Sequence, residues 1–394
     1  MSDMEIVFKK IDGYRDEVIR MQTELTSKAA LGPKNGGTGE HEKAAYLEKE
    51  LKALKPDFFQ EIKAPDESAH GGYRPSLAAR WKGEEDGPVV WVLSHMDIVP
   101  PGDLSLWGGD PYKVRVEGEL LIGRGVEDNQ HGIVSSILGL KALLGSGKTP
   151  KRPVGLIMAA DEETGSEYGL DYILKNHGGL FNPDDLIIVP DGGNEDGTMI
   201  EVAEKSMLWL RFTVTGRQCH GSTPQKGNNS LYGAARMILA LDQLKSEFTI
   251  MDELFSPPGS TFEATKMEAN VPNINTIPGK NVFYMDCRIM PDYRVDDVLR
   301  TAEALGKEIA EELGLSVFVE PVYRQDAENP TSPDAPVVKA LAKAVKRITG
   351  RDAVPMGIGG GTVAAFFRQA GLPAAVWLSM PDSAHQPNEY CPIG

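Results

Sequence analysis

The hydrophobic positions of this chain change their spacing along its length, and these changes predict its architecture. Residues 4–29 and 40–54 carry apolar side chains at helical spacing, separated by the glycine-rich GPKNGGTGEHE. An edge hairpin is expected around SLAARWKGEEDGP. Beyond it, continuous apolar runs such as PVVWVLSHMD, VGLIMAADEE and LIIVPDGG alternate with helical patterns such as IVSSILGLKALLGSG. Because such runs are typical of strands buried on both faces, the pattern predicts an α/β fold with a largely parallel mixed sheet flanked by helices.

The pattern changes near Lys205. The segment SMLWLRFTVTG alternates apolar and polar residues, as expected for an antiparallel strand with one solvated face. Two strand–helix–strand units follow, and after the proline-rich RQDAENPTSPDAP the α/β pattern returns. We therefore predict a catalytic domain formed by residues 1–205 and 326–394, with a small α+β domain, residues 206–325, inserted into it.

Composition and charge narrow the class of protein. A chain of 394 residues with 41% hydrophobic and 25% charged residues fits a soluble protein of two domains. The net charge of -16 argues against a nucleic-acid partner. The three cysteines suit a reducing compartment and exclude a disulfide framework. No apolar run reaches transmembrane length and the N-terminus lacks the apolar core of a signal peptide, so we expect a cytoplasmic protein without a membrane partner.

Histidines and carboxylates gather where the apolar strands end. In a doubly wound sheet the carboxyl ends of the strands meet at one edge, so residues far apart in the sequence converge there. The candidates are His95 and Asp97, Asp128, the adjacent Asp161, Glu162 and Glu163, Asp191, and His385.

Histidine mixed with carboxylate, without thiolate, suits Zn²⁺, Co²⁺ or Mn²⁺. The set is large enough for two ions if one carboxylate bridges them, and Asp128 at a helix start is well placed to do so. Asp97, two residues after His95, faces the same side of an extended segment and would orient that imidazole. Of the neighbours Glu162 and Glu163, one can bind metal while the other serves as general base. Bound cations would also offset the mutual repulsion of these acids.

Six segments in order, SHMDIVP, GRGVEDNQHG, DEETGS, PDGG, HGSTPQKGNN and SAHQPNE, resemble the motifs of the M20 family of metallohydrolases. That family includes acetylornithine deacetylase, succinyl-diaminopimelate desuccinylase, carboxypeptidase G-like enzymes and bacterial dipeptidases. The resemblance implies a zinc-peptidase-like catalytic domain with an inserted ferredoxin-like lid and dimerisation domain, and hence a homodimer. The family usually has Lys-Gly after the bridging aspartate, whereas this chain has DNQHG.

The resemblance also implies roles for single residues. It implies two zinc ions, one held by His95, Asp128 and Asp191, the other by Asp128, Glu163 and His385. It makes Glu162 the general base, Asp97 the partner of His95, and His220 of the inserted domain the group that stabilises the oxyanion, often across a dimer interface. Positions matching contacts to the carboxylate or polar end of the substrate are Asn275, Arg288, Gly360, Gly361 and Thr362.

The expected function is hydrolysis of an amide bond in a small molecule by a metal-held water, with Glu162 as base. An N-acyl amino acid and a dipeptide remain open as substrates. Arg288 could clamp a substrate carboxylate or only pair with an acid of the inserted domain. The alternative from another class is a non-catalytic metal-binding or scaffold protein that keeps this fold.

Overall fold

The structure is a computed structural model that describes residues 3–394, and it divides into two compact units. Unit 1 comprises the chain up to Val202 together with Thr331–Pro355 and Phe366–Gly394. Unit 2 comprises Ala203–Pro330 and Met356–Ala365. The division into residues 1–205, 206–325 and 326–394 stays a prediction. In the structure residues 356–365, which include the sequence GIGGG, group with unit 2.

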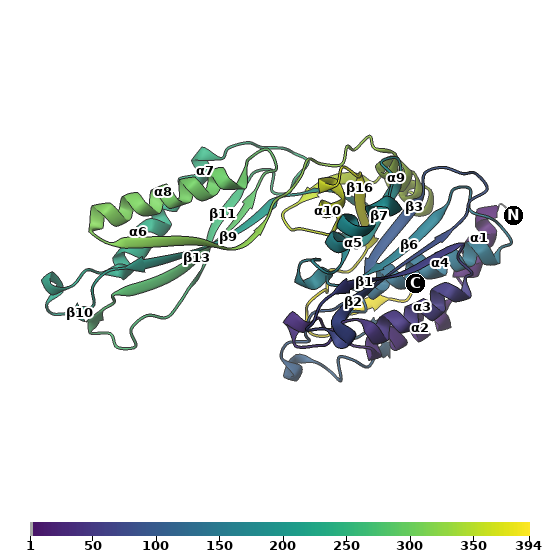
Figure 1. Cartoon of the computed structure of the whole chain (residues 1–394), viewed down its shortest axis with the longest axis horizontal. Helices are drawn as coiled ribbons and strands as arrows, with labels where there is room; N and C mark the ends of the chain where they lie inside the picture. The colour runs from purple at the N-terminus through teal and green to yellow at the C-terminus, as the bar shows by residue number, and fades with distance from the viewer. Residues whose placement is uncertain (1–2) are drawn as a thin grey trace. The chain divides into compact units, whose positions relative to one another are not determined.

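An eight-stranded sheet forms the centre of unit 1, with the strand order β1-β2-β6-β3-β7-β16-β8-β15 (Figure 1). Strands β6, β3, β7 and β16 are parallel, whereas β1, β2 and β8 pair with antiparallel neighbours, so the predicted largely parallel mixed sheet is confirmed. The strands are β1 Phe58–Pro65, β2 Tyr73–Trp81, β3 Val90–His95, β6 Val154–Ala159, β7 Leu186–Asn194, β8 Met199–Glu204, β15 Val354–Ile358 and β16 Ala374–Ser379.

Unit 1 also contains helices that flank this sheet, and a small three-stranded sheet of order β17-β5-β4. The helices are α1 Asp3–Ile11, α2 Arg15–Ser27, α3 His41–Ala53, α4 Gln130–Gly145, α5 Leu170–His177, α9 Pro336–Thr349 and α10 Ala364–Gln369. The strands of the small sheet are β4 Arg115–Glu117, β5 Leu120–Ile122 and β17 Tyr390–Pro392.

Two local predictions were wrong. The single helix expected over residues 4–29 is two helices, because the poor helix former Gly13 lies in the turn between α1 and α2. The hairpin expected around residues 76–88 instead joins β2 to the preceding β1, which is the edge strand, while β2 lies inside the sheet against β6.

Apolar side chains cover both faces of the central sheet. On one face α2, α3 and α4 pack against β2, β3 and β6 through a cluster that includes Leu47, Ile137 and Leu156. On the other face the ring of Trp91 contacts that of Phe181. A Cβ atom at residue 155, opposite Trp91, would lie 2.0 Å from the indole, so this position requires glycine. The sheet is therefore buried on both faces, as its continuous apolar runs predict.

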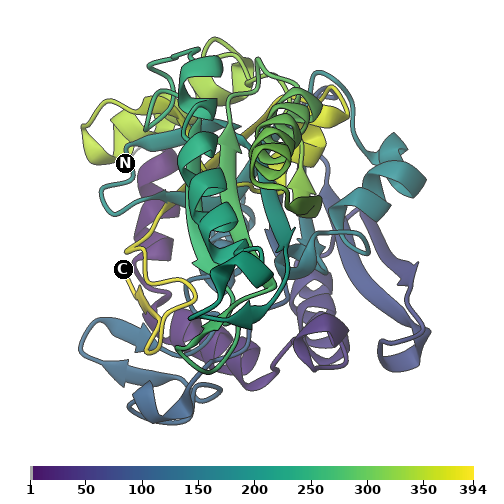
Figure 2. The ribbon, with the colours of Figure 1, turned by 90° about the vertical axis from the view of Figure 1, so that its left-hand side faces the viewer.

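Unit 2 is an antiparallel sheet of order β11-β13-β9-β14 covered by helices α6, α7 and α8. In chain order the main elements run β9-α6-β11-β13-α8-β14, the ferredoxin-like arrangement. The helices α6 and α8 of this unit lie side by side (Figure 2). The elements are β9 Ser206–Thr215, β10 Cys219–His220, α6 Ser230–Leu241, α7 Leu244–Glu247, β11 Thr261–Met267, β12 Thr276–Ile277, β13 Lys280–Ile289, α8 Val295–Leu313 and β14 Ser316–Gln325.

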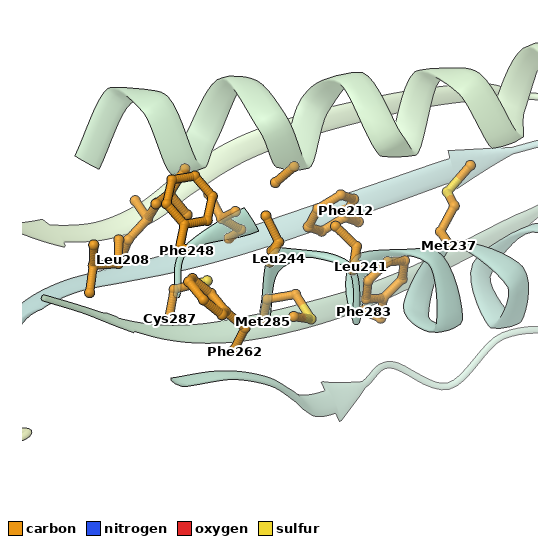
Figure 3. Close-up of a cluster of buried hydrophobic side chains, with 14 of the residues drawn as sticks. Leu208, Phe212, Met237, Leu241, Leu244, Phe248, Phe262, Phe283, Met285 and Cys287 are labelled. Atoms are coloured by element: carbon orange, nitrogen blue, oxygen red, sulfur yellow. The ribbon is translucent and has the colours of Figure 1, made fainter. Parts of the chain in front are cut away.

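A hydrophobic core of its own stabilises unit 2 (Figure 3). Buried and more exposed positions alternate along β9, which confirms the predicted solvated face of this sheet. The rings of Phe212 and Phe283 stack with their centroids 4.7 Å apart. No helix among residues 3–394 is long and apolar enough to cross a membrane.

Candidate metal centre

The ends of three parallel strands bring the predicted ligands together. Strand β3 lies between β6 and β7, and His95 at its end pairs with Ala159 at the end of β6. Glu162 and Glu163 lie three and four residues after the end of β6, and Asp191 lies within β7. Since the strands are parallel, these side chains share the carboxyl edge of the sheet.

Asp128 joins two histidines that are far apart in the sequence. Its Oδ1 atom lies 2.9 Å from Nε2 of His95, and its Oδ2 atom lies 3.0 Å from Nε2 of His385. Each oxygen of one carboxylate therefore faces a different imidazole. This is the arrangement expected of a carboxylate that bridges two ions.

Other carboxylates lie close to the same histidines. Oδ1 of Asp191 lies 3.4 Å from Nε2 of His95, and Oε2 of Glu163 lies 3.2 Å from Nε2 of His385. Potential metal ligands form two groups, and within each group the ligand atoms lie within 4.8 Å of one another. The groups are His95, Glu162 and Asp191, and His95, Asp128 and Glu163.

Asp97 orients its neighbours in two ways. Its main-chain oxygen lies 3.0 Å from Nδ1 of His95, nearer than its carboxylate at 3.5 Å. A proton on Nδ1 would be donated to this carbonyl, leaving the Nε2 lone pair for a metal. The Asp97 carboxylate meanwhile accepts the main-chain N–H of Glu162 and that of Glu163, each at 3.0 Å. The sequence predicts that Asp97 orients His95, but not that its carboxylate holds both glutamates.

Asn129 is a further residue that sequence reasoning missed. It lies in the DNQHG segment that departs from the family pattern, and its side-chain amide donates to Oδ1 of Asp191 at 2.7 Å and to the main-chain oxygen of Pro190. This buried amide therefore fixes the carboxylate of Asp191.

Asp161, although adjacent to Glu162, belongs to a different network. Its Oδ1 atom lies 3.2 Å from the guanidinium of Arg74, which also binds the buried carboxylate of Glu40 at 2.7 Å. Asp161 further accepts the main-chain N–H of Tyr168 at 3.0 Å. Arg74 and Glu40 were missed by sequence reasoning. The available signal was an arginine within the apolar strand β2, where an unpaired charge would be costly.

Burial and mutual repulsion set the protonation of the cluster. Burial raises the pKa of Glu162 well above its usual range and that of Glu163 to about 7, and nearby carboxylates add to both shifts. Hydrogen bonds to Asp128 and Glu163 raise the pKa of His385 to about 10. Burial opposes protonation of His95, yet the carboxylates around it raise its pKa well above normal. The cluster therefore attracts positive charge, and its nitrogen and oxygen donors fit a divalent cation.

The predicted residues of unit 2 lie in two places. His220 lies on the short strand β10, pairs with Thr276 of β12, and its Nδ1 lies 2.8 Å from the hydroxyl of Ser222. Asn275 precedes Thr276, and its main-chain oxygen accepts the N–H of Gly221 at 2.7 Å. His220 at the end of β10 and Asn275 just before β12 are thus neighbours.

The second place is the glycine-rich segment after β15. Arg288 donates to the main-chain oxygen of Gly359 at 2.9 Å and binds both carboxylate oxygens of Asp286. Thr362 donates to the carboxylate of Glu204 at 2.6 Å. Gly360, Gly361 and Thr362, which are predicted to contact the substrate, belong to this segment, and Arg288 binds it.

A mixed α/β sheet with a cluster of possible metal ligands at its carboxyl edge is typical of a metal-dependent hydrolase. The chain belongs to peptidase family M20/M25/M40, whose family model matches residues 91–394.

Comparison with individual proteins agrees with this assignment. A metallohydrolase of Methanococcus maripaludis is 40% identical over 400 residues, which cover 96% of this chain and 95% of the relative. The succinyl-diaminopimelate desuccinylase of Ectopseudomonas mendocina is 26% identical over 77% of this chain and 78% of its own. Among solved structures, the dipeptidase Dug1p of Saccharomyces cerevisiae superposes with a TM-score of 0.75, at 15% identity, over 100% of this chain and 95% of its own. The last likeness concerns the fold alone.

Proposed function

We propose that this protein binds two divalent cations and hydrolyses an amide bond of a small substrate, a dipeptide or an N-acyl amino acid. The observation that carries the proposal is Asp128, whose oxygens face His95 and His385 separately. The family is a peptidase family and one relative is a desuccinylase, and together they support this range of substrates.

The side chains present fit a pair of cations. One ion would be held by His95, Asp128 and Asp191, and the other by Asp128, Glu163 and His385. Nitrogen and oxygen donors without thiolate favour Zn²⁺, with Co²⁺ or Mn²⁺ as alternatives. When bound, the cations would polarise the scissile carbonyl and lower the pKa of the attacking water.

Glu162 is the residue we assign to proton transfer. It lies within the cluster, and the Asp97 carboxylate fixes its main-chain N–H. Positive charge beside it would lower the raised pKa of its carboxyl and leave it ionised at neutral pH. Its carboxylate then accepts a proton from the attacking water and returns it to the leaving nitrogen.

The residues of unit 2 would act on the substrate. We assign stabilisation of the oxyanion to His220, and its replacement by alanine should lower kcat far more than metal content. Contacts to the carboxylate or polar end of the substrate are assigned to Asn275, Arg288, Gly360, Gly361 and Thr362. We further propose a cytoplasmic homodimer that associates through unit 2, which light scattering in solution can check.

Replacing Glu162 by glutamine tests the proposal directly. The amide keeps the size of the side chain but cannot accept the proton, so turnover should fall by about 10²–10⁴-fold while both cations are retained. Amine release from a panel of dipeptides and N-acyl amino acids, together with metal analysis, gives both readings. Glu167→Gln, on an exposed side chain of the same segment, is the matched control.

Two outcomes would contradict the assignment. Loss of metal together with activity in Glu162→Gln would place Glu162 among the ligands. Absence of amine release by the cation-loaded wild-type protein across the whole panel would favour a non-catalytic metal-binding or scaffold protein with this fold.

A further inference from the structure

Two segments remote in sequence carry the ligands Asp128 and His385, and a buried glutamate reaches from one segment to the other. Oε1 of Glu389 accepts the main-chain N–H of Glu127 at 2.9 Å and that of Asp128 at 3.0 Å. Oε2 accepts the N–H of Gly125 at 2.9 Å and binds the guanidinium of Arg124 at 2.6 Å. Glu389 therefore fixes the backbone from which Asp128 projects.

A second glutamate makes the reverse connection. Glu127, adjacent to Asp128, has a fully buried side chain. Its carboxylate accepts the main-chain N–H of Asp382 at 2.8 Å and that of Ser383 at 2.7 Å, and it also accepts the Ser383 hydroxyl. The Ser383 hydroxyl in turn accepts the N–H of Tyr390 at 3.0 Å. Each segment thus sends one carboxylate into the backbone donors of the other.

This reciprocal pair supports an unusual backbone. Asp382, His385 and Asn388 all adopt positive φ angles, which residues other than glycine rarely adopt unless the surroundings hold them there. Arg124, already bound to Glu389, also donates to the main-chain oxygen of His385 at 3.3 Å. The position of the His385 imidazole consequently depends on contacts made by the segment that carries Asp128.

We propose that Glu127 and Glu389 are positioning residues that set the spacing between Asp128 and His385 before any cation arrives. The inference rests on the proposed metal site. Both carboxylates accept hydrogen bonds from main-chain N–H groups. They would therefore affect a bound cation only through Asp128 and His385. A carboxylate accepts hydrogen bonds at both of its oxygens. A glutamine side chain has only one oxygen, and its NH2 group would face N–H donors of the backbone, so glutamine cannot replace either glutamate.

The test compares Glu389→Gln with Asp185→Asn. The buried carboxylate of Asp185 likewise accepts N–H groups, from Val89 at 2.7 Å and from the indole of Trp91 at 3.0 Å, but it lies where β3 and β7 begin, at the opposite edge of the sheet. Both variants should lower the Tm of the metal-free protein. Only Glu389→Gln should weaken zinc binding, by about 10–100-fold in calorimetric titration, as expected for a partner of the ligands.

The visible absorption spectrum of the Co²⁺-loaded protein provides an independent reading. It should change in Glu389→Gln and Glu127→Gln and stay that of the wild type in Asp185→Asn, because only the first two alter the ligand geometry. If Glu389→Gln gives no folded protein, Ser383→Ala, which removes only the shared hydroxyl, should show the same weakening and spectral change to a smaller extent.

The possible failures are distinguishable. If the wild-type protein binds no cation, the proposed function fails. If the wild type binds two cations and the glutamine variants or Ser383→Ala bind zinc as tightly as Asp185→Asn with an unchanged Co²⁺ spectrum, the glutamates only stabilise the fold and the inference alone is overturned.

Discussion

Two acidic clusters, one buried and one half-buried, meet in the stretch DEE, and their charge is neutralised differently. Asp161 turns toward Arg74, which also binds Glu40, so this cluster contains its own permanent cation. The next residues, Glu162 and Glu163, face other carboxylates and the two histidines. Adjacent acids at a strand end therefore need not share a role, because the direction of each side chain determines which counter-ion it contacts.

The difference should appear in what each cluster needs in order to be stable. The Asp161 cluster already contains its counter-ion, Arg74, in the folded chain. Its contribution to the free energy of unfolding should therefore not depend on added metal. The cluster around Asp128 is neutralised either by protons, as the raised pKa of His385 indicates, or by cations. Changes that remove the counter-ion of one cluster should therefore leave the other intact.

The largest effect is expected from Arg74→Met. Removing the guanidinium leaves the buried carboxylates of Glu40 and Asp161 without their counter-ion, which should destabilise the fold by about 3–5 kcal/mol. Chemical unfolding of the zinc-loaded and the metal-free protein should show a similar loss in both. A loss confined to the zinc-loaded protein would mean that Arg74 supports the metal cluster instead. Arg115→Met, on a strand of the small sheet, is the control.

Metal removal should have the next largest effect. At ten times their dissociation constants, two cations bound only by the folded protein stabilise it by about 3 kcal/mol in total. Chelation should therefore lower the Tm of the wild type and of Arg74→Met by similar amounts. An unchanged Tm after verified removal of all metal would contradict the account of the Asp128 cluster.

The smallest effect concerns pH in the metal-free protein. Burial and Asp128 raise the pKa of Glu163 from its usual 4.5 to about 7, so the folded state keeps a proton that the unfolded state releases between these values. Stability should therefore fall as pH rises from 4.5 to 7, by on the order of 2 kcal/mol from this group. Glu163→Gln should remove that part of the slope, measured as unfolding free energy against pH. An identical slope in the two proteins would show that Glu163 does not titrate there.

The sequence predicts well which histidines and carboxylates come together, because the rule that places them is topological. Apolar runs ending in His95, Glu163 and Asp191 identify parallel strands whose ends must meet, whatever the details of packing. Contacts between buried charges follow no such rule. Glu127 and Glu389 look like ordinary acids in polar segments, and only the fold brings each to backbone donors more than 250 positions away.

Elsewhere the local residue pattern did not show where an element begins or ends, and the prediction was wrong. The helical spacing of residues 4–29 continues through Gly13 although the helix does not, since the apolar positions of α1 and α2 serve separate helices. Strand β1 was missed because its alternation is weak at an exposed edge of the sheet. Edges and helix breaks depend on small local free energies, whereas the buried centre of the sheet leaves a strong signal.

Anomalous diffraction from a crystal of the zinc-loaded protein locates its bound cations directly. We expect two peaks, one at about 2.0–2.2 Å from ligand atoms of His95 and Asp191 and one at that distance from those of His385 and Glu163, with an oxygen of Asp128 bound to each. A single peak, or peaks that Asp128 does not join, would contradict this expectation.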